Sequence, residues 1–83
     1  MAPAVAAQND TIWLESKTYN VVGLNEKVSG HVAELARAIR NGIPAYPDSS
    51  REGFFDVELN SGWSYIHVRD DVRTVYLIAF SRN

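Results

Sequence analysis

The chain has 83 residues, of which 46% are hydrophobic and 22% charged, and it contains no cysteine. A chain of this length has room for one small globular domain, and without cysteine it has no disulfide and no thiolate metal site. Eight basic and ten acidic side chains give a net charge of −2. This is the wrong sign for a protein that binds mainly the phosphate backbone of nucleic acids, so we expect no nucleic-acid partner.

The first ten residues are rich in alanine and lack both the basic start and the apolar stretch of a secretory signal. We therefore expect a disordered tail over residues 1–10 and a single α+β domain over residues 11–83. No apolar run approaches the roughly 20 residues that span a bilayer. The sequence predicts a soluble, cytoplasmic protein without membrane contact.

Two runs of β-branched and aromatic residues lie within residues 11–22, separated by Glu15-Ser16-Lys17. They are typical of extended strand. Either one bent strand or two short strands fits this pattern, and we expect the segment to pair with an edge of the sheet.

A helix is predicted from about Glu26 to Asn41. Asn25 can cap its start and Gly42 can end it, with Pro44 preventing continuation. Gly30 costs roughly 1 kcal/mol against alanine, so either the helix begins later or another group packs close to it. Five apolar residues recur at spacings of four, four, three and four, which places them on one helical stripe: Leu24, Val28, Val32, Leu35 and Ile39.

Residues 43–53 are rich in proline, glycine, serine and aspartate, which predicts a connecting loop. Three strand-like runs follow over residues 54–59, 63–69 and 73–80, joined by segments short enough for hairpin turns. The expected fold is α+β, with one amphipathic helix packed on an antiparallel sheet of about four strands. The element order is β(β)-α-β-β-β, and the last three strands form a meander.

Turn lengths then predict which side chains share a face of the sheet. A two-residue turn at Asp70-Asp71 places an aliphatic set toward the helix: Ser64, Ile66, Val68, Val75, Leu77 and Ala79. The other face receives Trp63, Tyr65, His67, Arg69, Thr74, Tyr76, Ile78 and Phe80. An even number of loop residues after Leu59 adds Phe55, Val57 and Leu59 to the aliphatic side. It also leaves Asp56 and Glu58 on the other side, where they can pair with Arg69.

One helix cannot cover both sides of such a sheet, and an exposed aromatic patch usually marks a contact surface. The predicted binding surface consists of Trp63, Tyr65, His67, Arg69, Tyr76 and Phe80. Three alternatives stay open. The loop around Tyr46-Pro47 or the N-terminal tail folds over this surface as a second small core; a protein partner or a second copy of the chain covers it; or it forms a ligand or catalytic site.

His67 is the best acid–base candidate by its reference pKa near 6.5, although a lone histidine in a strand is more often structural. His31 is expected to be solvated. Asp70 and Asp71 are expected to serve the turn, not calcium. Two histidines on different elements, with no acid at ligand spacing, predict no metal site. No phosphate-binding glycine motif and no nucleophile elbow occurs, so we expect no cofactor and no enzyme activity.

The segment from Tyr65 to Arg82 resembles the C-terminal hairpin of RelE/ParE-type toxins. This resemblance implies a metal-independent endoribonuclease in which His67, Arg69, Tyr76 and Arg82 act on the scissile phosphate. The uncovered side of the predicted sheet favours a different function, a small non-enzymatic protein-interaction module that forms a homodimer or binds a protein partner. A third possibility is a small-ligand site between the Tyr46-Pro47 segment and the sheet.

Overall fold

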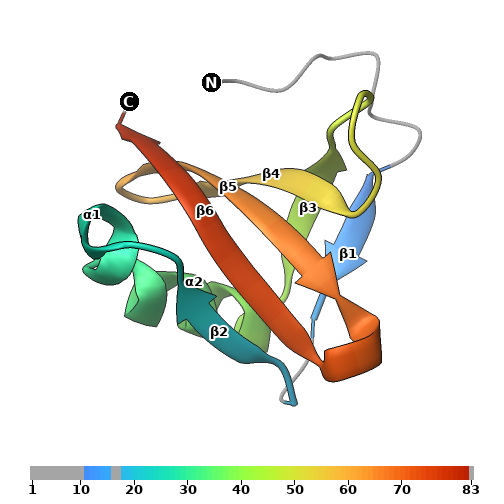
Figure 1. The fold of residues 1–83 in the computed structure, drawn as a ribbon, viewed down its shortest axis with the longest axis horizontal. Coiled ribbons are helices and arrows are strands. Elements are labelled where there is room, and N and C mark those ends of the chain that lie inside the picture. Colours follow the sequence, from blue (N-terminus) through green and yellow to red (C-terminus); the bar gives the residue numbers. More distant parts are fainter. Residues whose placement is uncertain (1–10, 16–17, 83) are drawn as a thin grey trace.

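The computed structural model describes residues 11–15 and 18–82, so the tail expected over residues 1–10 lies outside the described residues. The fold is α+β, as predicted, with two helices and one mixed sheet of six strands (Figure 1). The elements in chain order are β1 (Ile12–Leu14), β2 (Asn20–Gly23), α1 (Glu26–Ser29), α2 (Val32–Asn41), β3 (Ile43–Pro47), β4 (Phe54–Leu59), β5 (Gly62–Arg69), a 3₁₀ turn (Asp70–Val72) and β6 (Thr74–Arg82).

The strand order across the sheet is β1-β3-β4-β5-β6-β2. The predicted meander of β4, β5 and β6 is confirmed, but the sheet has six strands instead of about four and is not wholly antiparallel. The N-terminal segment forms two short strands, one at each edge of the sheet. β1 pairs antiparallel with β3, and β2 pairs parallel with β6.

This connectivity requires the sheet to coil. The chain from Leu14 to Asn20 can span at most about 20 Å. The edges of a flat six-stranded sheet would lie about 24 Å apart. Since β1 and β2 occupy those edges, the edges must approach each other, and the sheet curves around the helices (Figure 1).

Strand β3 replaces the first half of the loop that was expected over residues 43–53. Its prolines argued against a strand because proline cannot donate to a ladder. The strand tolerates them because its pairing is short. Pro44 lies opposite Trp13 of the three-residue strand β1, and β3 meets β4 through only two residue pairs, at Tyr46 and Pro47.

The predicted helix is interrupted at Gly30 and His31, leaving the single turn α1 and the longer α2. Asn25 caps α1 as expected, because its side-chain Oδ1 accepts a hydrogen bond from Lys27 N at 2.9 Å. The Gly42 amide donates to the Ile39 carbonyl at 3.2 Å and ends α2.

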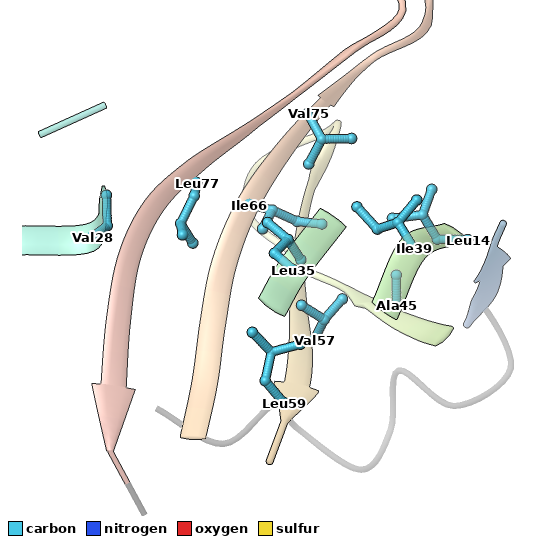
Figure 2. Packing of buried hydrophobic residues seen from close by; sticks show 10 residues of the cluster. All are labelled: Leu14, Val28, Leu35, Ile39, Ala45, Val57, Leu59, Ile66, Val75 and Leu77. Carbon is cyan, nitrogen blue, oxygen red and sulfur yellow. The ribbon is translucent and has the colours of Figure 1, made fainter. Parts of the chain in front are cut away.

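Both helices pack on one face of the sheet and bury most of the predicted stripe. Val28, Leu35 and Ile39 are at most 3% exposed, but Leu24 lies before α1 and is 54% exposed, so its place on the stripe was wrong. Figure 2 shows the resulting core, in which the helical residues meet side chains from five strands: Leu14, Ala45, Val57, Leu59, Ile66, Val75 and Leu77.

The register of β4 and β5 follows the even-loop prediction. Leu59 lies opposite Gly62, so the turn contains only Asn60 and Ser61. Phe55 is therefore opposite Ile66 on the helix-covered face, while Asp56 is opposite Tyr65 on the other face.

The connection between β5 and β6 is longer than the predicted two-residue turn. Arg69 lies opposite Thr74, with four residues between them, and Arg73 takes the left-handed conformation at φ 47°. The turn is two residues longer than predicted, and an even difference leaves the alternation of side chains between the two faces unchanged. Ile66, Val68, Val75 and Leu77 therefore still share the helix-covered face. The expectation that Asp70 and Asp71 serve the turn is confirmed.

A β-bulge changes which face of the sheet the last side chains of β6 occupy. Ile66 lies opposite Leu77, but Tyr65 lies opposite Ala79, so Ile78 is an extra residue in β6. An extra residue reverses the faces that follow it. Phe80 consequently lies opposite the buried Ser64 on the helix-covered face, and Ala79 is exposed on the other side.

Two glycines offer a paired stability test. Gly42 has φ 96°, and a Cβ there would lie 2.7 Å from the Trp13 ring, whereas a Cβ at Gly30 would meet nothing within 4 Å. We expect Gly42→Ala to lower the free energy of unfolding by about 1–3 kcal/mol. Gly30 has helical φ and ψ, so Gly30→Ala should raise it by about 0.5–1 kcal/mol. Urea unfolding of both variants checks this, and equal effects would contradict the local geometry described here.

Candidate functional site

The candidate site is the face of the sheet that points away from the helices. We call it the aromatic face and define it by six rings contributed by four strands: Tyr46, Phe54, Trp63, Tyr65, His67 and Tyr76. All six side chains are only partly buried. Four of them were predicted as binding-surface residues.

The two remaining predicted residues behave differently. Arg69 lies on the side of the aromatic face but is exposed, and it donates two hydrogen bonds to Asp71, at 3.2 and 2.5 Å. The bulge moves Phe80 to the opposite face, where it packs against the core and stacks on His31 with ring centroids 3.6 Å apart. The prediction that Phe80 joins the other aromatic residues was therefore wrong. The prediction that His31 is solvated was wrong as well.

The rings of the aromatic face contact one another across the strands. Phe54 stacks on His67 with centroids 4.2 Å apart and lies 5.6 Å from Tyr65. His67 in turn lies 6.2 Å from Tyr76 on the next strand. These contacts form a continuous apolar layer that is not part of the core beneath the helices.

The loop over residues 48–53 borders one end of this layer. The Arg51 guanidinium lies 3.8 Å above the centre of the Phe54 ring and 5.9 Å from that of Tyr65. The Tyr65 hydroxyl donates to the Asp48 carboxylate, and this hydrogen bond lowers the pKa of Asp48. The loop thus supplies both a cation and an anion at the rim of the aromatic face.

His67 has a structural environment. Its Nδ1 lies 3.1 Å from the Gly53 carbonyl oxygen, the acceptor for an Nδ1 proton, and its ring is stacked on Phe54. Gly53 leaves little space, because a Cβ at this position would lie 3.2 Å from the histidine ring. These contacts fix the orientation of the imidazole and agree with the structural interpretation of this histidine.

Asp56 is the unusual residue of this region. It lies on β4 between Tyr46 of β3 and Tyr65 of β5, on the side of the aromatic face, and is only 9% exposed. Burial is the largest cause and raises its pKa, and the nearby Asp48 carboxylate makes only a smaller contribution in the same direction. The ion pair expected between Arg69 and Asp56 or Glu58 does not form, because Arg69 is held by Asp71.

The segment proposed to form a small-ligand site does not lie in a loop, since Tyr46 and Pro47 end strand β3. A hollow of about 360 Å³ lies elsewhere, between α1 and the end of β6, where Lys27, His31 and Phe80 contribute to its lining. It is separate from the aromatic face, because none of the six rings that define that face lines it.

The structure brings together only some of the residues that the resemblance to RNA-cleaving toxins singles out. His67 and Tyr76 are opposite each other on β5 and β6, while the Arg69 guanidinium is paired with Asp71 at the turn. Within residues 11–15 and 18–82, no group of three or more His, Asp or Glu side chains is placed to hold a metal ion. None of the helices in these two ranges is both long enough and apolar enough to cross a bilayer.

The sequence analysis placed Asp56 on this side of the sheet but missed Phe54, Tyr46 and Arg51. Phe54 shares a strand face with Asp56, so the predicted hairpin register already implied its place beside His67. Tyr46 was assigned to a loop because of its neighbouring prolines. Nothing in the sequence pattern indicates that Arg51 lies over Phe54, since this depends on the path of the loop.

Comparison with models of protein families, with curated proteins and with solved structures finds no match for this chain.

The raised pKa of Asp56 predicts how stability responds to its removal. The folded state holds the Asp56 proton more tightly than the unfolded chain, so the ionised carboxylate destabilises the fold at neutral pH. This penalty disappears below the ordinary pKa of 3.8. We expect Asp56→Asn to increase the free energy of unfolding at pH 7 by on the order of 1 kcal/mol. The increase should shrink as the pH falls through the raised pKa.

Denaturant unfolding at pH 7 and near pH 3 measures this difference. Glu52→Gln is the control, because it removes the same charge from an exposed loop residue and should leave stability almost unchanged at both pH values. A loss of stability in Asp56→Asn at pH 7 would show that the carboxylate is stabilised by its surroundings.

Proposed function

We propose that this protein is a small non-enzymatic interaction module that binds a protein partner through its aromatic face. The observation that carries the proposal is the unequal covering of the sheet. Both helices pack on one side, while six partly exposed rings from four strands lie on the other. Connected aromatic side chains of this kind are typical of the centres of protein interfaces.

The rigidity of this surface supports binding. The rings stand on paired strands and are held by stacking, by the His67 contact with Gly53 and by the Tyr65 hydrogen bond to Asp48. A surface whose side chains are already ordered loses little conformational entropy when a partner docks. Scattered exposed apolar residues would not have this property.

The charges favour a different protein over a second copy of the chain as the partner. Asp48 and the buried Asp56 lie on the side of the aromatic face, and the described arginines near it are already engaged. Arg51 lies on Phe54, and Arg69 is paired with Asp71. Two identical copies would bring these carboxylates toward each other, whereas a basic partner would compensate them.

A photo-crosslinking amino acid locates the contact. We expect Tyr76→p-benzoylphenylalanine to give a crosslinked product with a partner protein from the native host, and Leu24→p-benzoylphenylalanine to give none. Leu24 is the matched control because it is apolar and exposed but lies before α1. The identified partner, once purified, should bind the wild type, and Trp63→Ala should weaken binding by about 1–3 kcal/mol.

The other functions give different results in the same experiment. A crosslinked product with twice the mass of the chain, with a dimer in sedimentation equilibrium, would assign the face to self-association. Cleavage of RNA by the purified protein, abolished in His67→Ala, would support the nuclease alternative. Equal crosslinking from both positions would contradict the proposal.

A further inference from the structure

We propose that Asp56 and the rings of Tyr46, Trp63 and Tyr65 form a binding site for a protonated amine that retains an N–H, such as the side chain of a lysine on the partner. This inference rests on the proposed function and adds the chemical group that the aromatic face recognises.

The strand register places the carboxylate between aromatic side chains. Asp56 is directly opposite Tyr46 on one neighbouring strand and directly opposite Tyr65 on the other. Directly opposite residues have Cβ atoms about 5 Å apart. Both tyrosine side chains therefore start beside Asp56 on the same face of the sheet.

The third ring belongs to Trp63, which lies opposite Glu58, the next residue of β4 on the same face as Asp56. Tyr46 and Trp63 stand on β3 and β5, which lie on either side of β4 and are separated by two strand spacings, about 9.6 Å. Their ring centres are only 6.0 Å apart and are inclined at 58°. The two rings consequently lean toward each other across β4. Asp56 lies on this strand and is 9% exposed, although no helix lies on this side among the described residues.

The carboxylate has no partner among the described residues. Their hydrogen bonds do not include one to the Asp56 side chain, and their ion pairs join Arg69 to Asp71 and Arg73 to Asp70. A largely buried charge without a hydrogen-bond partner is costly, and a bound ion or group can compensate it. The neighbouring Asp48 adds a second negative charge, so the missing group should be a cation.

The same surface already holds a cation a short distance away. The Arg51 guanidinium rests on the Phe54 ring at 3.8 Å, beside Tyr65 and Asp48. Aromatic faces attract cations through the ring quadrupole, and the attraction is stronger where water is excluded. A carboxylate can also accept a hydrogen bond from a primary ammonium but not from a quaternary one, so we favour an amine with at least one N–H.

Titration with a small lysine probe tests this site directly. We expect Nα-acetyl-lysine N-methylamide to shift the amide resonances of Tyr46, Asp56 and Tyr65 and the indole resonance of Trp63, with saturation at millimolar concentrations typical of such small ligands. The neutral Nε-acetylated form of the same probe is the matched control ligand. It should bind at least about tenfold more weakly, since it lacks the charge.

Two variants separate the carboxylate from general effects of charge. Asp56→Asn should weaken binding of the lysine probe by about tenfold or more, and Glu52→Gln by less than about twofold. Amide spectra of each variant show whether the fold is retained. If Asp56→Asn does not fold, Trp63→Leu replaces it and should weaken binding because it removes one of the three rings.

Equal binding of the charged and acetylated probes, unchanged binding in Asp56→Asn, or no binding of the lysine probe would each overturn the inference. The proposed interaction function is judged separately, by crosslinking from Tyr76, which is not part of the site. Crosslinking that persists when the lysine probe fails would retain the interaction module and reject the amine site alone. If the lysine probe does not bind and Tyr76 gives no crosslinked product, both proposals are rejected.

Discussion

The two-residue turn of Asn60 and Ser61 is the constraint on which the rest of the molecule depends. It sets Leu59 opposite Gly62 and so decides which side chains of β4 meet the helices and which meet the rings of β5. A shift of one residue would exchange the two faces, placing Asp56 in the core and Val57 among the aromatic side chains. The packing of Leu35 and Ile39 against Val57 and Ile66 therefore secures the aromatic face as well as the core.

Much of this arrangement could be predicted from alternation and spacing, because burial on one side of a strand leaves a period of two in the sequence. The helix-covered set Val57, Ile66, Val75 and Leu77 was recovered in this way, even though the turn before β6 is longer than expected. The position of Phe80 could not be predicted, since the extra residue Ile78 leaves no pattern of its own. The parallel pairing of β2 with β6 and the place of Arg51 also depend on contacts between distant parts of the chain, to which local periodicity is blind.

The aromatic face combines two properties that are seldom found together without a functional reason. Its rings are ordered by stacking and by the loop over residues 48–53, which adds to stability, whereas Asp56 is placed among them at a cost. Natural proteins retain unfavourable groups chiefly where binding or catalysis requires them. The carboxylate that lowers the stability of the free protein would be stabilised by a bound cation. The energy that its burial costs in the free protein would then contribute to the affinity for that cation.

The placement of β1 and β2 at opposite edges of the sheet also has a consequence during synthesis. Both strands leave the ribosome before their partners β3 and β6, and β6 is made after the other described elements. Until then the nascent chain carries edge strands whose backbone groups are unpaired, and such edges invite contact with other chains. The sheet is thus completed only when β6 pairs with β2, a strand about 50 residues earlier in the chain. We expect slow folding for a domain of this size because these contacts are so distant in sequence.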